Sequence, residues 1–178
     1  MTTAKTTATT PAPLDRHGAH WELHDCIRVG TQHDRETSDI DLGTLDIHTQ
    51  RHPFRAKGLP FIVLTNTAEG FNFSGWLTPD SAQILINAIE SGLRTPPAEH
   101  AGRIDITTSI TFINCKYNTY VYSRTHHREH VINLSLVTPG YQATYDITHT
   151  HAPDLITALR AAITRCQQVS AALAAKAK

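Results

Sequence analysis

Two histidines near the C-terminus have the spacing of a metal-binding pair. His149 and His151 flank one threonine at the end of an alternating run, directly before a helical pattern that opens with Pro153. Residues two apart on a strand point to the same face, so both imidazoles could reach one ion. Zinc takes three or four such ligands in tetrahedral geometry. Further candidate ligands are His126, His127 and His130, and, near the N-terminus, His17, His20, His24 and Cys26.

The surroundings of this pair favour a structural junction over a metal site. Metallo-β-lactamase-type hydrolases carry HxHxDH at such a junction, but this chain has Pro153 and Asp154 where that signature needs Asp and His. No histidine follows His151, and a chain with 12 histidines produces HxH spacings easily. Phosphate-binding glycine loops and the GxSxG elbow are also absent from the sequence. We therefore predict a non-enzymatic protein without metal or cofactor, its junction histidines held by hydrogen bonds.

Composition sets broad limits on the partner. The 178 residues, 40% of them hydrophobic, suffice for one compact unit. Lys plus Arg equal Asp plus Glu at 16 each, which argues against a partner bound through many cations but allows a local basic patch.

The sequence also predicts where the protein is found. Its three cysteines lie far apart, which favours a reducing compartment over a set of disulfides. The sequence shows no secretory h-region and no run of 18 apolar residues, so we predict a cytoplasmic protein with no membrane partner.

Two helices with similar openings stand out. The first begins with Thr78 as N-cap, followed by Pro79 and Asp80. The second opens with Pro153 and Asp154, 74 residues later. Their predicted apolar stripes are Ile84, Leu85, Ala88 and Ile89 in the first helix, and Leu155, Leu159, Ala162, Ile163 and Cys166 in the second.

Four alternating segments precede each helix. They span 20–30, 38–48, 59–66 and 70–77 in the first half, and 103–113, 116–123, 130–138 and 142–149 in the second. These patterns predict an α+β fold: a tandem ββββα–ββββα pseudo-duplication with two antiparallel sheets, each packed on its following helix. The alternative is a single irregular α+β domain whose helices share a Pro-Asp opening by accident.

The same patterns divide the chain into four segments. We predict a disordered tail (1–18), a first repeat (19–93), a linker (94–102) and a second repeat (103–178), the repeats forming one compact unit. The apolar stripe of the last helix continues past Cys166. We expect this extension to pack on the other helix or on a second subunit, which predicts a homo-oligomer.

The sheet faces turned away from the helices offer a second kind of site. Trp76 stands among polar residues of its strand, and basic loops follow the second strand of each repeat. Cations can track phosphates while flat rings stack on bases, which suits single-stranded nucleic acid. The alternative is a solvated hairpin tip, with Trp76 covered by the N-terminal arm or by a second subunit. The candidate residues are Arg51, Arg55, Lys57, Trp76, Lys116, Tyr120, Tyr122, Arg124 and Arg128.

Two segments carry a family resemblance. "GFNFSGWLTPDSAQILINAI" (70–89) resembles the last strand, capped turn and helix start of the Whirly proteins, and "FRAKGLPFIVL" (54–64) resembles their short Lys-Gly-Lys strand motif, with Arg55 and Lys57 at the cationic positions. The resemblance implies binding of single-stranded nucleic acid and oligomerisation through the helices. The alternative function is a protein-interaction or regulatory module, of phage or mobile-element type, that blocks a partner. A histidine-rich metal-binding protein is the third hypothesis.

Overall fold

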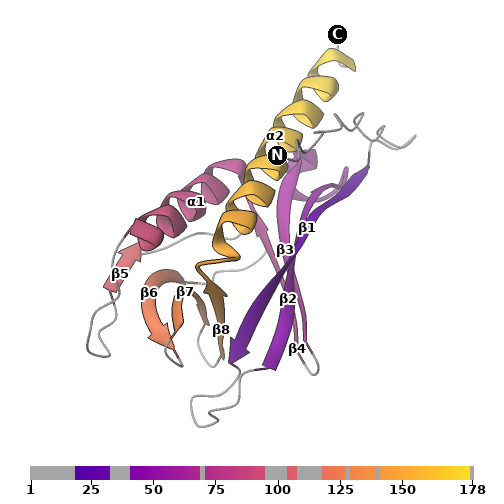
Figure 1. The fold of residues 1–178 in the computed structure, drawn as a ribbon. Coiled ribbons are helices and arrows are strands. Elements are labelled where there is room, and N and C mark those ends of the chain that lie inside the picture. Colours follow the sequence, from indigo (N-terminus) through magenta and orange to yellow (C-terminus); the bar gives the residue numbers. More distant parts are fainter. Residues whose placement is uncertain are drawn as a thin grey trace, which may run out of the picture.

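The chain passes twice through four strands and one helix (Figure 1). The computed structural model describes residues 19–32, 41–68, 71–94, 104–107, 118–126, 129–138 and 141–176. The predicted tail and nearly all of the predicted linker lie outside these ranges. The first half comprises β1 (His20–Gln32), β2 (Asp41–Arg51), a short turn η1 (Ala56–Gly58), β3 (Phe61–Ala68), β4 (Phe71–Leu77) and α1 (Pro79–Arg94). The second comprises β5 (Ile104–Thr107), β6 (Asn118–His126), β7 (Glu129–Thr138), β8 (Tyr141–Thr148) and α2 (Ala152–Lys176).

The eight strands form one antiparallel sheet in the order β4-β3-β2-β1-β8-β7-β6-β5. The fold is therefore α+β, as predicted, but the prediction of two separate sheets is wrong. The halves join where Gly30, Thr31 and Gln32 pair with Asp146, Tyr145 and Thr144. β1 makes this junction because it runs to Gln32, past the predicted end of the strand, and so brings its last residues beside β8.

Each helix covers mainly the half of the sheet that it does not follow. α2 packs on β1, β2 and β3, whereas α1 packs chiefly on β6 and β5. The prediction that each sheet packs on its following helix is therefore wrong. β8 lies next to β1, so a helix that leaves β8 reaches the first meander directly. The sheet curves beneath the helices, and α1 runs from the end of β4 toward β5 at the opposite edge (Figure 1).

The core forms where the helical stripes meet the inner faces of the strands. Leu155, Leu159 and Ala162 are fully buried in α2, in agreement with the predicted stripe. In α1 the predicted stripe is confirmed at Leu85, Ala88 and Ile89, which are buried, but wrong at Ile84, which is exposed while Ile86 is buried. The strands contribute residues at alternating positions: Ile27, Leu45, Ile47, Ile62, Leu64, Leu77, Ile132, Leu134, Tyr145 and Ile147.

The start of α1 has the predicted cap. The Ser81 amide donates to Thr78 Oγ1 over 3.1 Å, which satisfies one of the free amides at the helix start. The far end of α2 extends beyond the sheet (Figure 1), and between Ser170 and Lys176 only Leu173 is not exposed. Association of this end with a second subunit stays a prediction. Neither helix is apolar enough over its length to span a membrane, among the residues that the structure describes.

Candidate nucleic-acid interface

The side of β1–β4 turned away from the helices, here called the outer face, carries two rows of large side chains. Glu22 and Thr49 face α2, so their strand neighbours point the opposite way. One row on the outer face crosses all four strands and consists of Leu23, His48, Val63 and Trp76, each opposite the next. The row beside it, nearer the loop between β2 and β3, consists of Trp21, Gln50 and Phe61.

Rings from these two rows form two stacked pairs. The ring centroids of Trp21 and His48 are 4.8 Å apart with an interplanar angle of 30°. Those of Phe61 and Trp76 are also 4.8 Å apart, at 25°. Phe61 is fully buried, whereas Trp76 is half-buried and Trp21 is 61% exposed. In each pair a buried ring therefore supports a more accessible indole.

Arg55 lies over the indole of Trp76. Its guanidinium carbon is 5.2 Å from the ring centroid, within the range of a cation–π contact. Two of the residues predicted from sequence are thus brought together, although they are 21 positions apart. The stack of Phe61, Trp76 and Arg55 places a cation at the edge of an aromatic surface.

The β2–β3 loop, residues 52–60, contains three consecutive residues with positive φ. Ala56, Lys57 and Gly58 have φ of 47°, 57° and 72°. This left-handed conformation costs roughly 1–2 kcal/mol at each residue other than glycine. Backbone bonds within the loop hold it: Gly58 donates to Arg55 O over 2.8 Å, and Leu59 donates to Ala56 O over 3.1 Å. The loop is therefore a preformed turn with stored backbone strain.

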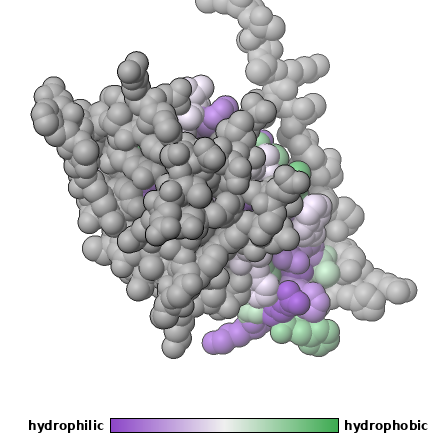
Figure 2. Space-filling view, turned by 90° about the horizontal axis from the view of Figure 1, so that it is seen from below, coloured by the Kyte–Doolittle hydropathy of each residue, from purple (hydrophilic) through white to green (hydrophobic). Residues whose placement is uncertain are grey.

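The cations of this loop have different environments. Arg51 Nε donates to the carbonyl of Gly58 over 2.9 Å, so this side chain holds the turn. Lys57 is exposed, and so are the apolar side chains of Phe54 and Leu59, at 91% and 58%. Figure 2 shows hydrophilic side chains directly beside hydrophobic ones at the lower right edge of the coloured surface. Arg55 and Lys57 are thus the loop cations best placed to meet a ligand.

The other predicted residues belong to the second half of the chain. Tyr120, Tyr122 and Arg124 lie in β6. Lys116 and Arg128 lie outside the described residues.

The junction histidines are arranged as a helix start. The His151 amide donates to the Thr148 carbonyl over 3.0 Å, and His151 Nδ1 is 3.8 Å from Asp154 Oδ2. His126 pairs with Glu129 across β6 and β7. Among the described residues, no group of three or more His, Cys, Asp or Glu side chains could hold a metal ion.

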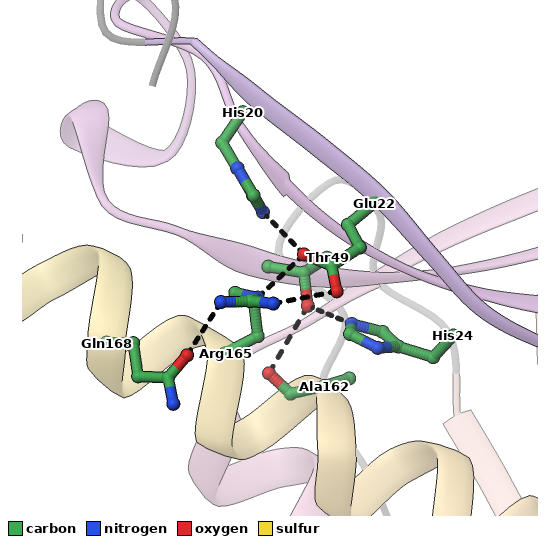
Figure 3. Close-up of polar contacts among 7 residues, drawn as sticks. All are labelled: His20, Glu22, His24, Thr49, Ala162, Arg165 and Gln168. Atoms are coloured by element: carbon green, nitrogen blue, oxygen red, sulfur yellow. Dashed lines mark hydrogen bonds and ion pairs between the residues drawn. The ribbon is translucent and has the colours of Figure 1, made fainter. Parts of the chain in front are cut away.

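A buried polar cluster joins β1 and β2 to α2 (Figure 3). Arg165 binds the Glu22 carboxylate with two nitrogens, Nε at 2.6 Å from Oε2 and Nη2 at 2.9 Å from Oε1. Its third nitrogen, Nη1, donates to Gln168 Oε1 over 2.7 Å. His20 Nε2 lies 3.4 Å from Glu22 Oε2, and its side chain is almost fully buried. We call this set, together with His24 and Thr49, the Arg165 cluster.

Thr49 fixes the proton position of one histidine. Thr49 Oγ1 donates to the Ala162 carbonyl over 3.3 Å, so it accepts at 2.7 Å from His24 Nε2, which therefore carries a proton. Burial lowers the pKa of both His20 and His24; the Arg165 charge lowers both further, while Glu22 opposes the shift. Burial acts to raise the pKa of Glu22, but the hydrogen bond and charge of Arg165 outweigh it and lower that pKa. The cluster therefore favours the neutral forms of His20 and His24 beside the Arg165–Glu22 ion pair.

Acidification is expected to destabilise the fold through this cluster. Because the pKa values of His20 and His24 are lower in the folded state, the unfolded chain binds more protons once pH falls below about 6.5. Glu22 acts in the same direction at lower pH, since its lowered pKa gives stability that is lost as the carboxylate is protonated. Urea denaturation should show a falling midpoint from pH 7.5 to 5.5.

Two histidine variants test whether the pH dependence comes from the Arg165 cluster or from histidines elsewhere in the chain. His24→Gln should flatten the dependence on pH, whereas His52→Gln in the loop should leave it unchanged. Equal slopes for all three proteins would contradict the assignment.

Three aromatic residues of the outer face, Trp21, His48 and Phe61, were not among the predicted site residues. Alternation in 20–30 puts Trp21 and Leu23 on one face, which is a usable signal. Their stacking partners follow only from the register of β1 on β2 and of β3 on β4.

Comparisons with known proteins give little further guidance. No family model matches the chain, and no curated protein matches it. One solved structure that resembles it was described under "Mutations in SsgB correlate to longitudinal cell division during sporulation of Streptomyces coelicolor". The two share 11% identity with a TM-score of 0.42, over 85% of this chain and 93% of the other. A likeness at this level carries no argument about fold or function.

Proposed function

We propose that the protein binds single-stranded nucleic acid through the outer face of β1–β4 and the β2–β3 loop. One observation carries the proposal: Arg55 lies over Trp76, and Trp76 stacks on the buried ring of Phe61. Stacking on aromatic rings holds unpaired bases whatever their sequence, and nearby cations hold the phosphates. Arg55 and Lys57 take the phosphate role: the Arg55 guanidinium moves from the Trp76 ring to a phosphate, and a base stacks on the indole in its place.

The local charge supports this partner although the net charge is zero. The sequence has no acidic residue between Asp46 and Glu69, a stretch that includes Arg51, Arg55 and Lys57. The loop therefore forms a cationic region on an otherwise balanced chain. Its turn is already held by hydrogen bonds from Arg51 and from its own backbone. A preformed site loses less conformational freedom on binding than a flexible one.

Salt dependence gives the direct test. Fluorescence anisotropy of labelled oligo(dT) should report binding that weakens as salt rises from 50 to 200 mM. Affinity that depends on contacts to phosphates falls strongly over this range. The double variant Arg55→Ala with Lys57→Ala removes two contacts, so the slope of log K against log salt should shrink by about 1.4. We expect its affinity at low salt to fall about tenfold or more, given about 1 kcal/mol for each exposed cation.

The control removes two cations elsewhere. Arg94 and Lys176 are exposed near the ends of α1 and α2. Their double alanine variant should keep the wild-type slope. Absence of binding at low salt, or binding that ignores salt, would refute the proposal.

A protein partner is the second candidate. The exposed apolar side chains of Trp21, Leu23, Phe54 and Leu59 favour it, because aromatic and aliphatic anchors are typical of protein interfaces. Under this alternative the protein blocks or regulates its partner through the same outer face. Tight association that is insensitive to salt would favour this alternative over nucleic acid.

We also propose that the chain is a tandem duplication. Support comes from the repeated order of four strands and one helix, and from the Pro-Asp pair at the start of each helix. The crossed packing of α1 and α2 also fits an exchange of helices between two copies of one unit. The resemblance to the Whirly proteins stays a prediction.

A further inference from the structure

We propose that the nucleic-acid site has a second stacking platform at Trp21, across the outer face from Trp76. The inference rests on the proposed function and adds a residue and a direction to it. Trp21 is 61% exposed. An indole so exposed contributes little to the core, yet it is held in place by its stack on His48.

The support beneath Trp21 resembles the support beneath Trp76. His48 is 8% exposed and Phe61 is fully buried, so each ring forms a fixed base under an indole. Burial lowers the pKa of His48, although Asp46 opposes the shift, so its imidazole is neutral at pH 7. A neutral ring attracts no phosphate. The Trp21–His48 pair therefore offers a stacking surface and no charge, in contrast to Trp76, which has Arg55 above it.

The register sets the direction of a bound strand. β1 and β4 lie on either side of β2 and β3, so their backbones are about 14 Å apart, three strand spacings. The Trp21 ring stacks on His48 of β2 and the Trp76 ring on Phe61 of β3, so the two platforms lie over the two central strands. A nucleic-acid strand that uses both runs across the β-strands, from the β1 side toward the β4 side.

The charges near Trp21 are compatible with a base at this place. Trp21 pairs with Gln50, one residue from the end of β2 at which the cationic loop begins. Glu22 faces the opposite side of the sheet, where Arg165 binds it. Asp46 lies on the outer face two residues beyond His48, away from the loop. The ligand therefore meets aromatic rings and cations at the loop end, and acidic groups only farther along the strands.

The two tryptophans allow each platform to be observed separately, because the chain has no others. In Trp76→Phe the only indole is Trp21, and in Trp21→Phe it is Trp76. Titration of each variant with oligo(dT) of twelve nucleotides should quench its fluorescence.

Affinity then tests whether the aromatic ring matters. With the twelve-nucleotide ligand, Trp21→Leu should bind roughly tenfold more weakly, within the range for loss of one stacked base, while keeping the wild-type salt slope. Leucine keeps apolar bulk at an exposed position, so the variant should fold, and urea denaturation checks that. Quenching of Trp76 alone, with full affinity in Trp21→Leu, would overturn the second platform and leave the proposed function intact. No quenching and no binding in wild type would instead refute the proposed function.

Discussion

Replacing Arg165 with methionine is expected to lower the free energy of unfolding by about 3 kcal/mol. Loss of one partner from a buried ion pair typically costs about 3–5 kcal/mol, because the remaining charge is left without compensation. The lower end applies here because the Glu22 side chain keeps 22% exposure to water. Methionine retains the apolar stem of arginine, so the loss reports the guanidinium and its two bonds to Glu22. Urea denaturation at pH 7.5 measures it.

The same helix provides a matched control. Arg160 binds Glu90 of α1 at 2.6 Å, the same distance as the Arg165–Glu22 contact, but the Arg160 side chain is 58% exposed. Arg160→Met should therefore cost less than about 1 kcal/mol, as exposed ion pairs do. Adding Glu22→Gln to Arg165→Met should recover part of the loss, because it removes the uncompensated charge. Equal losses for the two arginines would show that burial does not govern the strength of this contact.

Replacing Phe61 with alanine is expected to cost about 3–4 kcal/mol, because the ring is fully buried and its removal leaves a cavity. It should also weaken binding to oligo(dT), since Trp76 loses the ring against which it stacks. Urea denaturation gives the first effect. Anisotropy under conditions where the variant is folded gives the second.

Phe61→Leu separates the two effects. Leucine fills most of the volume, so the stability loss should stay near or below about 1.5 kcal/mol. The stacked pair is nevertheless lost, and binding should remain weaker than in wild type. Wild-type affinity in the leucine variant would mean that Phe61 serves the core alone and that Trp76 needs no aromatic support.

Local features of the fold could be predicted from the sequence because they depend on neighbouring residues. Thr78 and Pro79 fix where α1 begins, and the stripe through Leu155 and Leu159 fixes the buried face of α2. The error at Ile84 has a local origin too. Adjacent positions differ by about 100° around a helix, so several apolar residues can define a stripe, and tertiary packing selects among them.

The joined sheet and the crossed helices could not be predicted in the same way. Both depend on pairing between β1 and β8, which are more than 100 positions apart and contact through three residue pairs. No periodicity in either segment encodes that pairing.

The residues of the candidate site could likewise be predicted in part, but the contacts between them could not. Residue type alone indicated Arg55 and Trp76, since cations and an aromatic ring on a polar strand suit nucleic acid. Their contact depends on a left-handed turn through Ala56 and Lys57, two residues with no preference for positive φ. The Arg165 cluster has a comparable origin. Arg165 stands within an apolar stripe, and only the packing of α2 on β1 brings Glu22 to it.

The crossed helices have a consequence for synthesis of the chain. The inner face of β1–β3 is covered by α2, which is translated after all eight described strands. The middle of α2, at Thr164, follows the end of β4 by 87 residues, a delay of roughly 4–17 s at bacterial or eukaryotic elongation rates. Throughout that time the nascent first meander keeps apolar side chains uncovered. The first layer is thus completed only when α2 is made, and a ribosome that stalls before α2 releases a chain prone to aggregation and chaperone capture.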